Sequence, residues 1–94
     1  MRKPTIHMGG TGAESLAQDA KRARDALAKA LDALTVAHPN ARDYYPQGGD
    51  AHTEAANEHA ARIAAVMTVR DEMTKLFEHA MEAVLAREER NQRR

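Results

Sequence analysis

The residues of this sequence best suited to chemistry are those that could hold an anion, and one group lies near the N-terminus. Gly9, Gly10, Thr11 and Gly12 lie where a predicted extended arm meets the start of a predicted helix. A helix start offers free backbone N–H groups and the positive end of the helix dipole, and glycine lets a phosphate approach the backbone closely. The GK[ST] ending of a P-loop is missing, as is the spacing of a dinucleotide-binding glycine motif. The segment is therefore a candidate phosphate site, and a simple turn with a helix cap is the alternative.

A second group lies in the segment 42–45, which reads Arg-Asp-Tyr-Tyr. Tyrosine rings in a surface loop can stack on nucleobases, which contributes about 1–3 kcal/mol per base. Arginine recognises phosphate through paired N–H donors. In the alternative interpretation, the rings of Tyr44 and Tyr45 seal one end of the fold while Arg42 and Asp43 bond to loop backbone.

Further basic residues could complete such a site. The segment 21–29 carries four Lys or Arg residues, although ion pairs with Asp25 at helical spacings of three and four explain much of this charge. Arg70 interrupts the apolar stripe of a second predicted helix, where it could fix an oligomeric state, line a polar cavity at an interface, or extend outward between its neighbours. The predicted ligand-binding residues are Gly10, Thr11, Gly12, Lys29, Arg42, Tyr44, Tyr45 and Arg70.

The sequence offers no pattern typical of catalysis or metal binding. It has no cysteine, which excludes a disulfide scaffold, a thiolate zinc site and a thiol nucleophile. His52 and His59 are seven residues apart, too far to share a metal ion. His79 and Glu82 form a single i,i+3 pair, whereas a di-iron bundle needs several such motifs. We therefore expect no enzymatic activity, no cofactor and no metal.

The composition bounds the fold and the partners. The 94 residues suffice for one domain, and 14 Lys+Arg balance 14 Asp+Glu. This zero net charge argues against binding to duplex DNA or an anionic membrane by bulk charge. Alanine fills 20 positions, so we expect a thin core that favours oligomerisation. No apolar stretch approaches the ~20 residues that span a bilayer, and no apolar run follows Arg2 and Lys3 as in a signal peptide, which predicts a cytoplasmic protein.

The elements that must position these residues follow from hydrophobic periodicity. Apolar residues recur in steps of three and four through two long segments, which predicts an all-α fold. We expect an antiparallel two-helix hairpin with an extended N-terminal arm, all in one domain. The predicted elements are an arm over 1–10, a helix over 11–38, a loop over 39–49, a helix over 50–87 and a frayed tail over 88–94.

Local signals set the expected helix ends. Thr11 and Glu14 match the capping box, in which the Thr hydroxyl accepts from the N–H of Glu14 and the carboxylate reaches back. Pro39 ends the first helix at or just before the preceding residue. Asp50 is the predicted N-cap of the second helix. The two prolines and two glycines of the loop predict that it has no regular structure.

The predicted helices differ in length, at roughly 25 and 37 residues or about 37 and 55 Å. The first can then cover only about two thirds of the second. An exposed apolar face at the uncovered end would mark an interface, so we predict a symmetric homo-oligomer. The residues predicted to form its interface are Phe77, Ala80, Met81, Val84 and Leu85.

Three short motifs carry a resemblance to a known family. They are the stretch 4–11 (Pro-Thr-Ile-His-Met-Gly-Gly-Thr) before a helix, the stretch 39–47 (Pro-Asn-Ala-Arg-Asp-Tyr-Tyr-Pro-Gln), and Glu58-His59 early in the second helix. In this layout the chain resembles the phage anti-CBASS sponge proteins, which capture cyclic oligonucleotide signals. The resemblance implies a hexameric homo-oligomer that binds cyclic dinucleotides between subunits, without catalysis or metal, in an infected or lysogenic bacterial host. Sponge pockets place an aromatic ring on the base, and here only Tyr44 and Tyr45 could do so.

Two functions from different classes follow. The first is a phage-type immune-evasion protein that sequesters a nucleotide-derived ligand at subunit interfaces. The alternative is a helical hairpin that docks on a host or phage protein. A nucleic-acid binder would rest only on the arginines of the tail, so we expect no sequence-specific nucleic acid and no membrane partner. Gly10 and Tyr44 lie at opposite ends of the first helix, about 37 Å apart, so one small ligand could reach both only across two antiparallel subunits.

Overall fold

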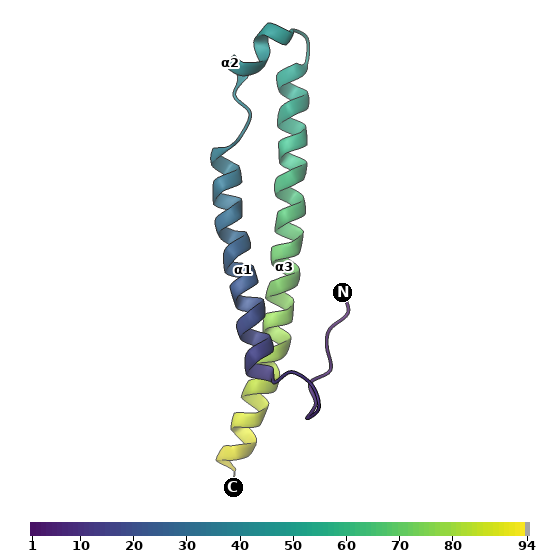
Figure 1. Ribbon diagram of the computed structural model, residues 1–94, viewed down its shortest axis with the longest axis vertical. Helices are drawn as coiled ribbons and strands as arrows, with labels where there is room; N and C mark the ends of the chain where they lie inside the picture. The colour runs from purple at the N-terminus through teal and green to yellow at the C-terminus, as the bar shows by residue number, and fades with distance from the viewer. Residues whose placement is uncertain (94) are drawn as a thin grey trace.

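The computed structural model describes residues 1–93 of the chain, and within them the protein is all-helical, as predicted (Figure 1). Its elements are α1 (Ala13–Val36), a short α2 (Ala41–Tyr44), a 3-10 turn η1 (Tyr45–Gln47) and α3 (Ala51–Gln92). An extended arm precedes α1. Arg94, part of the predicted tail, lies outside the described residues.

The two long helices lie side by side and run in opposite directions (Figure 1). Near the end of α1, the Leu34 carbonyl accepts from His59 Nε2 at 2.6 Å, close to the start of α3. At the other end, Glu14 Oε1 accepts from Arg87 Nη1 at 3.4 Å. The body measures 71 × 21 × 18 Å, with a radius of gyration of 20.2 Å. A compact chain of this length would have a radius of gyration of about 12 Å, so this molecule is a rod.

Small side chains make up most of the core between the helices. The buried apolar residues are Ala13, Ala17, Ala20, Leu31, Ala80 and Val84. Four of the six are alanines, which lets the backbones of α1 and α3 approach closely but buries little apolar area per residue. The core is therefore as thin as the composition predicts.

The predicted capping box is wrong. Gly12, rather than Thr11, is the N-cap of α1, and Leu16 N donates to its carbonyl at 3.0 Å. The Glu14 carboxylate pairs with Arg87 of α3 instead of turning back to Thr11. The Arg87 guanidinium, which is distant in sequence, thus competes with the helix start for the Glu14 carboxylate. A capping motif of four residues carries no information about such a distant partner.

The connection is more ordered than predicted. Asn40 caps α2, because its side chain accepts from Arg42 N at 3.2 Å. Pro46 falls in the first turn of η1, where the missing N–H is tolerated. Gly48 and Gly49 then adopt positive φ angles of 74° and 57°, which only glycine does at little cost. The prolines and glycines delimit short helical turns rather than excluding them.

The end of α3 also differs from the prediction. The helix continues to Gln92 instead of fraying from residue 88. Glu, Arg and Gln are good helix formers, and Arg93 Nη2 pairs with Glu89 at 2.7 Å at i,i+4 spacing. Asp50 is the N-cap of α3 as predicted, although its side chain makes no capping hydrogen bond.

The predicted oligomer interface is partly covered within the chain, whereas the helix lengths predicted that its residues would be exposed. Its contact with a second copy stays a prediction. Ala80 and Val84 are buried, and Phe77 and Met81 are half-buried. Only Leu85, at 58% exposed, is free as expected. The connection continues past the end of α1 before α3 begins, so α1 packs against the middle and later part of α3 and not against its first turns.

Candidate functional site

The predicted ligand-binding residues lie in three separate regions of the protomer. Gly10, Thr11 and Gly12 lead into α1 at one end of the rod, while Arg42, Tyr44 and Tyr45 lie in α2 and η1 at the other end (Figure 1). Lys29 and Arg70 lie between, on α1 and α3. One protomer therefore does not bring the set together.

The loop end presents one of its two tyrosine rings to solvent. The Tyr44 ring is half-buried and lies 6.2 Å from the His52 ring between centroids, at an interplanar angle of 49°. Tyr45 is 77% exposed. Arg42 is exposed as well. The interpretation in which both rings seal this end thus holds for Tyr44 alone, and Tyr45 has a free face on which a base could stack.

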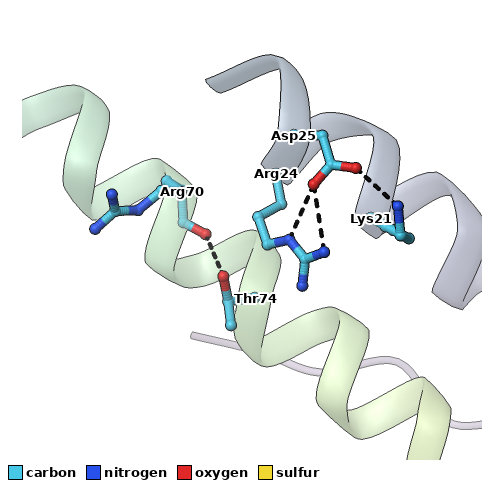
Figure 2. A network of polar contacts seen from close by, with 5 residues as sticks. All are labelled: Lys21, Arg24, Asp25, Arg70 and Thr74. Atoms are coloured by element: carbon cyan, nitrogen blue, oxygen red, sulfur yellow. Dashed lines mark hydrogen bonds and ion pairs between the residues drawn. The ribbon is translucent and has the colours of Figure 1, made fainter. Parts of the chain in front are cut away.

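Arg70 extends outward from α3 and pairs with its neighbour Asp71. Its Nε and Nη2 atoms donate to Asp71 Oδ1 at 3.3 and 3.2 Å. Figure 2 shows its guanidinium directed away from Arg24 and from α1, while its carbonyl accepts from Thr74 Oγ1 at 3.1 Å. Of the three interpretations of this residue, the outward-reaching side chain fits best.

The basic surface of α1 is largely a set of ion pairs. Lys21 Nζ lies 2.9 Å from Asp25 Oδ2, and Arg24 Nη2 lies 3.3 Å from Asp25 Oδ1 (Figure 2). The hydrogen bond from Lys21, followed by the charges of both cations, lowers the pKa of the Asp25 carboxyl below its ordinary value of 3.8. Arg24 also lies over the Phe77 ring, with Cζ 4.9 Å from the centroid. These cations serve the helix pair, and Lys29 is left exposed beside them.

The most suitable anion site is a groove at the arm end of the rod, which we call the arm-end groove. Its volume is about 450 Å³, within the range of small-molecule sites. The arm, the start of α1 and the later turns of α3 form it, and its lining residues are Ile6, His7, Met8, Gly10, Gly12, Ala13, Ala83, Arg87 and Arg90.

The start of α1 supplies backbone donors to this groove. Gly12 is the N-cap and has no side chain to accept from the first N–H groups of the helix, so these donors remain available to an anion. The His7 ring folds over Gly10, where an added Cβ would lie only 2.9 Å from Nε2. His7 Nδ1 also accepts from Gly9 N at 3.2 Å. The glycines therefore let the imidazole close one side of the groove.

Arg87 and Arg90 supply the charge, and neither is among the site residues predicted from the sequence. Arg87 is the last residue of the predicted second helix and Arg90 falls in the predicted frayed tail, whereas α3 continues through both. Arg87 Nη1 donates to Glu14 Oε1 at 3.4 Å. Arg87 therefore offsets the negative charge of Glu14 beside the groove, and Arg90 supplies the net positive charge. The signal that could have found them is their i,i+3 spacing in a stretch rich in helix formers.

A second groove lies on the other side of the arm, with a volume of about 580 Å³. Pro4 of the arm, Leu16 and Ala20 of α1, and Met73 and Leu76 of α3 give it apolar walls. Its remaining lining residues are charged, namely Arg2, Lys3 and Asp19. The arm is held there by His79, whose Nε2 donates to the Pro4 carbonyl at 2.7 Å.

Comparisons of the chain with protein-family models, with curated proteins and with solved structures find no match. The family suggested by the short motifs therefore stays a prediction. Among residues 1–93, no group of three or more His, Asp or Glu side chains is placed to hold a metal ion. Within the same residues, no helix has an apolar stretch long enough to traverse a bilayer.

Proposed function

We propose that this protein is a helical hairpin that captures a phosphate-bearing, nucleotide-derived ligand at the arm-end groove without chemically changing it. The observation that carries the proposal is the meeting of the uncapped start of α1 with Arg87 and Arg90 in one groove. Backbone N–H groups and guanidinium groups are complementary to phosphate oxygens. The resemblance to the cyclic-oligonucleotide sponges favours the same ligand class and a role in phage immune evasion.

The groove supplies the means to hold a phosphate, but its one aromatic ring is the His7 imidazole, and it has no Tyr, Phe or Trp. The exposed Tyr45 lies at the far end of the rod. A nucleotide-derived ligand in the groove would therefore reach a tyrosine ring only on a second copy of the chain. The proposal thus takes the protein to be a homo-oligomer with the ligand between subunits.

Isothermal titration calorimetry against cyclic di- and trinucleotides and ADP-ribose tests the proposal. Arg87→Ala and Arg90→Ala should each weaken binding about 10- to 150-fold, since a charge-assisted hydrogen bond contributes about 1.5–3 kcal/mol. The loss should be larger at low salt, because salt screens exposed charges. Arg93→Ala is the matched control, as this residue pairs with Glu89. No binding of any of these compounds at millimolar concentration would refute the proposal.

The alternative function, docking on a host or phage protein, is favoured by a different observation. Met67 and Leu85 are 41% and 58% exposed on α3, and a spacing of 18 residues, five helical turns, puts them on one side of it. A partner protein could bind this side without any small ligand. Met67→Glu would abolish such binding and leave the titrations with nucleotides unchanged, so the two functions are separable.

A further inference from the structure

One broad apolar side of the helix pair is only partly covered. The groove beneath the arm is lined by Leu16 and Ala20 of α1 and by Met73 and Leu76 of α3. Residues seven apart lie two turns along on nearly the same side of a helix. Steps of seven residues, forward along α1 and backward along α3, lead from these four residues away from the arm. The residues reached in this way form what we call the α1–α3 face, namely Ala23, Leu27, Ala30, Leu34, Val66 and Val69.

The arm covers the lower part of this side and leaves the α1–α3 face open. Arg2, Lys3 and Pro4 reach over the groove, where His79 holds the Pro4 carbonyl. Further along the rod, Val69 is 45% exposed. Ala30 is exposed, and Leu27 and Leu34 are only half-buried. Aliphatic side chains on both helices are thus left facing solvent along one continuous side.

The opposite side of the helix pair carries polar residues beside its apolar ones. There the groove between α1 and α3 has apolar walls of Phe77, Met81 and Val84. Its border along α1 is formed by Glu14, Gln18 and Lys21. The Lys21–Asp25–Arg24 ion pairs continue this polar border along α1 (Figure 2).

The exposed area of the chain indicates what covers the face. The chain exposes 7174 Å², whereas a monomeric protein of 10.4 kDa ordinarily exposes about 5,400 Å². The excess is about 1,800 Å² per chain relative to that scaling. If a symmetric pair hid this excess, it would bury about 3,600 Å² in all, within the range of obligate homodimers. A second copy of the chain is therefore an occupant of the right size.

The charges at the two ends of this side favour an antiparallel second copy. Arg2 and Lys3 lie at the arm end, where Asp19 lines the same groove, so the cations are in excess there. At the other end, Glu58 lies eleven residues, or three turns, before Val69, and Glu54 lies one turn beyond it. Glu58 pairs with Arg62 of its own chain at 3.6 Å, but its side chain stays 69% exposed. An antiparallel copy would place the arm cations of each chain beside these glutamates of the other, whereas a parallel copy would place like charges together.

We propose that a second copy of this chain packs antiparallel on the α1–α3 face, so that its Tyr45 reaches the level of the arm-end groove. Val69, Leu76, Ala83 and Arg90 are seven apart, so the face and the arm-end groove lie on one side of α3. With the two-fold axis near Val69, each copy's α2 and η1 come beside the other's arm end. The antiparallel packing does not depend on ligand binding, whereas the role of Tyr45 rests on the proposed function.

The packing is tested by the molar mass in solution, measured by light scattering without ligand. The unaltered chain should give at least twice its 10.4 kDa mass. Val69→Glu should reduce the mass to that of one chain. Met67→Glu is the matched control, because Met67 is 41% exposed and two residues away, on the other flank of α3. Should Val69→Glu lose helical circular dichroism, Ala30→Glu on the α1 side of the same face replaces it.

Three results would overturn the packing: a monomeric unaltered chain, equal masses for the two glutamate variants, or dissociation by Met67→Glu alone. The orientation is tested by cross-linking, since the chain has no cysteine of its own. A mixture of Lys3→Cys and Glu58→Cys chains should form a disulfide-linked pair, and neither variant alone should do so. Self-linking of Lys3→Cys chains would instead indicate a parallel pair.

The role of Tyr45 has its own readout. Tyr45→Ala should weaken binding of a cyclic dinucleotide about 10-fold and leave the molar mass unchanged. Full affinity in this variant would contradict the placement of the ring. Absence of any nucleotide binding would refute the proposed function while the mass and cross-linking results still decide the packing.

Discussion

The hydrogen bond between His59 and Leu34 joins the two long helices near the end of α1, and its removal gives a quantitative test of the fold. His59 is 7% exposed, and its Nε2 donates to the Leu34 carbonyl at 2.6 Å. This carbonyl belongs to the last turn of α1, whose final four carbonyls have no acceptor role within the helix. His59→Ala therefore leaves a half-buried acceptor without its partner and removes the imidazole from between the helices.

The expected loss can be estimated from these two effects. An unsatisfied buried polar group costs about 1–3 kcal/mol, and the lost burial of the ring adds to it at about 25 cal/mol per Å². We expect His59→Ala to lower the free energy of unfolding by about 2–3 kcal/mol. In a domain of this size the midpoint of thermal unfolding should fall by roughly 10 °C or more.

Urea denaturation followed by circular dichroism measures this change, at one fixed protein concentration because assembly would add to the apparent stability. His38→Ala is the matched control. His38 Nδ1 also bonds a backbone carbonyl, that of Thr35 at 2.9 Å, but on an exposed side chain, so its loss should stay below about 0.5 kcal/mol. His59→Gln, which keeps an N–H donor, should recover part of the stability. If His59→Ala and His38→Ala lose equal stability, the assignment of His59 as the bridge between the helices is wrong.

Two further predictions concern the helix start and the surface ion pairs. Thr11→Ala should change the free energy of unfolding by less than about 0.5 kcal/mol, because Gly12 is the N-cap of α1. Asn40→Ala should lower it by about 1 kcal/mol, because Asn40 caps α2 through its side chain. If Thr11→Ala loses more stability than Asn40→Ala in the same denaturation assay, Thr11 is the N-cap after all. The folded-state pKa of Asp25 is lowered by Lys21, so its stabilising contribution is complete above the ordinary pKa of 3.8 and is lost as the pH falls through the lowered value. Stability measured against pH should therefore fall less steeply in acid for Asp25→Asn, and an unchanged slope would count against the pairing.

The local elements of this protein follow from its sequence alone. Steps of three and four between apolar residues predict two long helices, because a helix turns once in 3.6 residues. Pro39 ends the first helix within a few residues of the predicted place, since proline disfavours helical geometry in the residue before it. The many alanines predict a thin core, since small side chains bury little area. The distance between Gly10 and Tyr44 likewise follows from helical rise.

The tertiary structure decided the features that depend on contacts between segments far apart in sequence. The Glu14 carboxylate pairs with Arg87, a group 73 residues away, so the local capping motif gives the wrong partner. The connection continues along the rod past the end of α1, and this shifts α1 toward the later turns of α3. Ala80 and Val84 are therefore buried, although the lengths of the two predicted helices alone predicted that they would be exposed. The same register brings Arg87 and Arg90 to the start of α1. Periodicity fixes which side of a helix is apolar, but the register between two helices depends on how their side chains and the connection fit together in space.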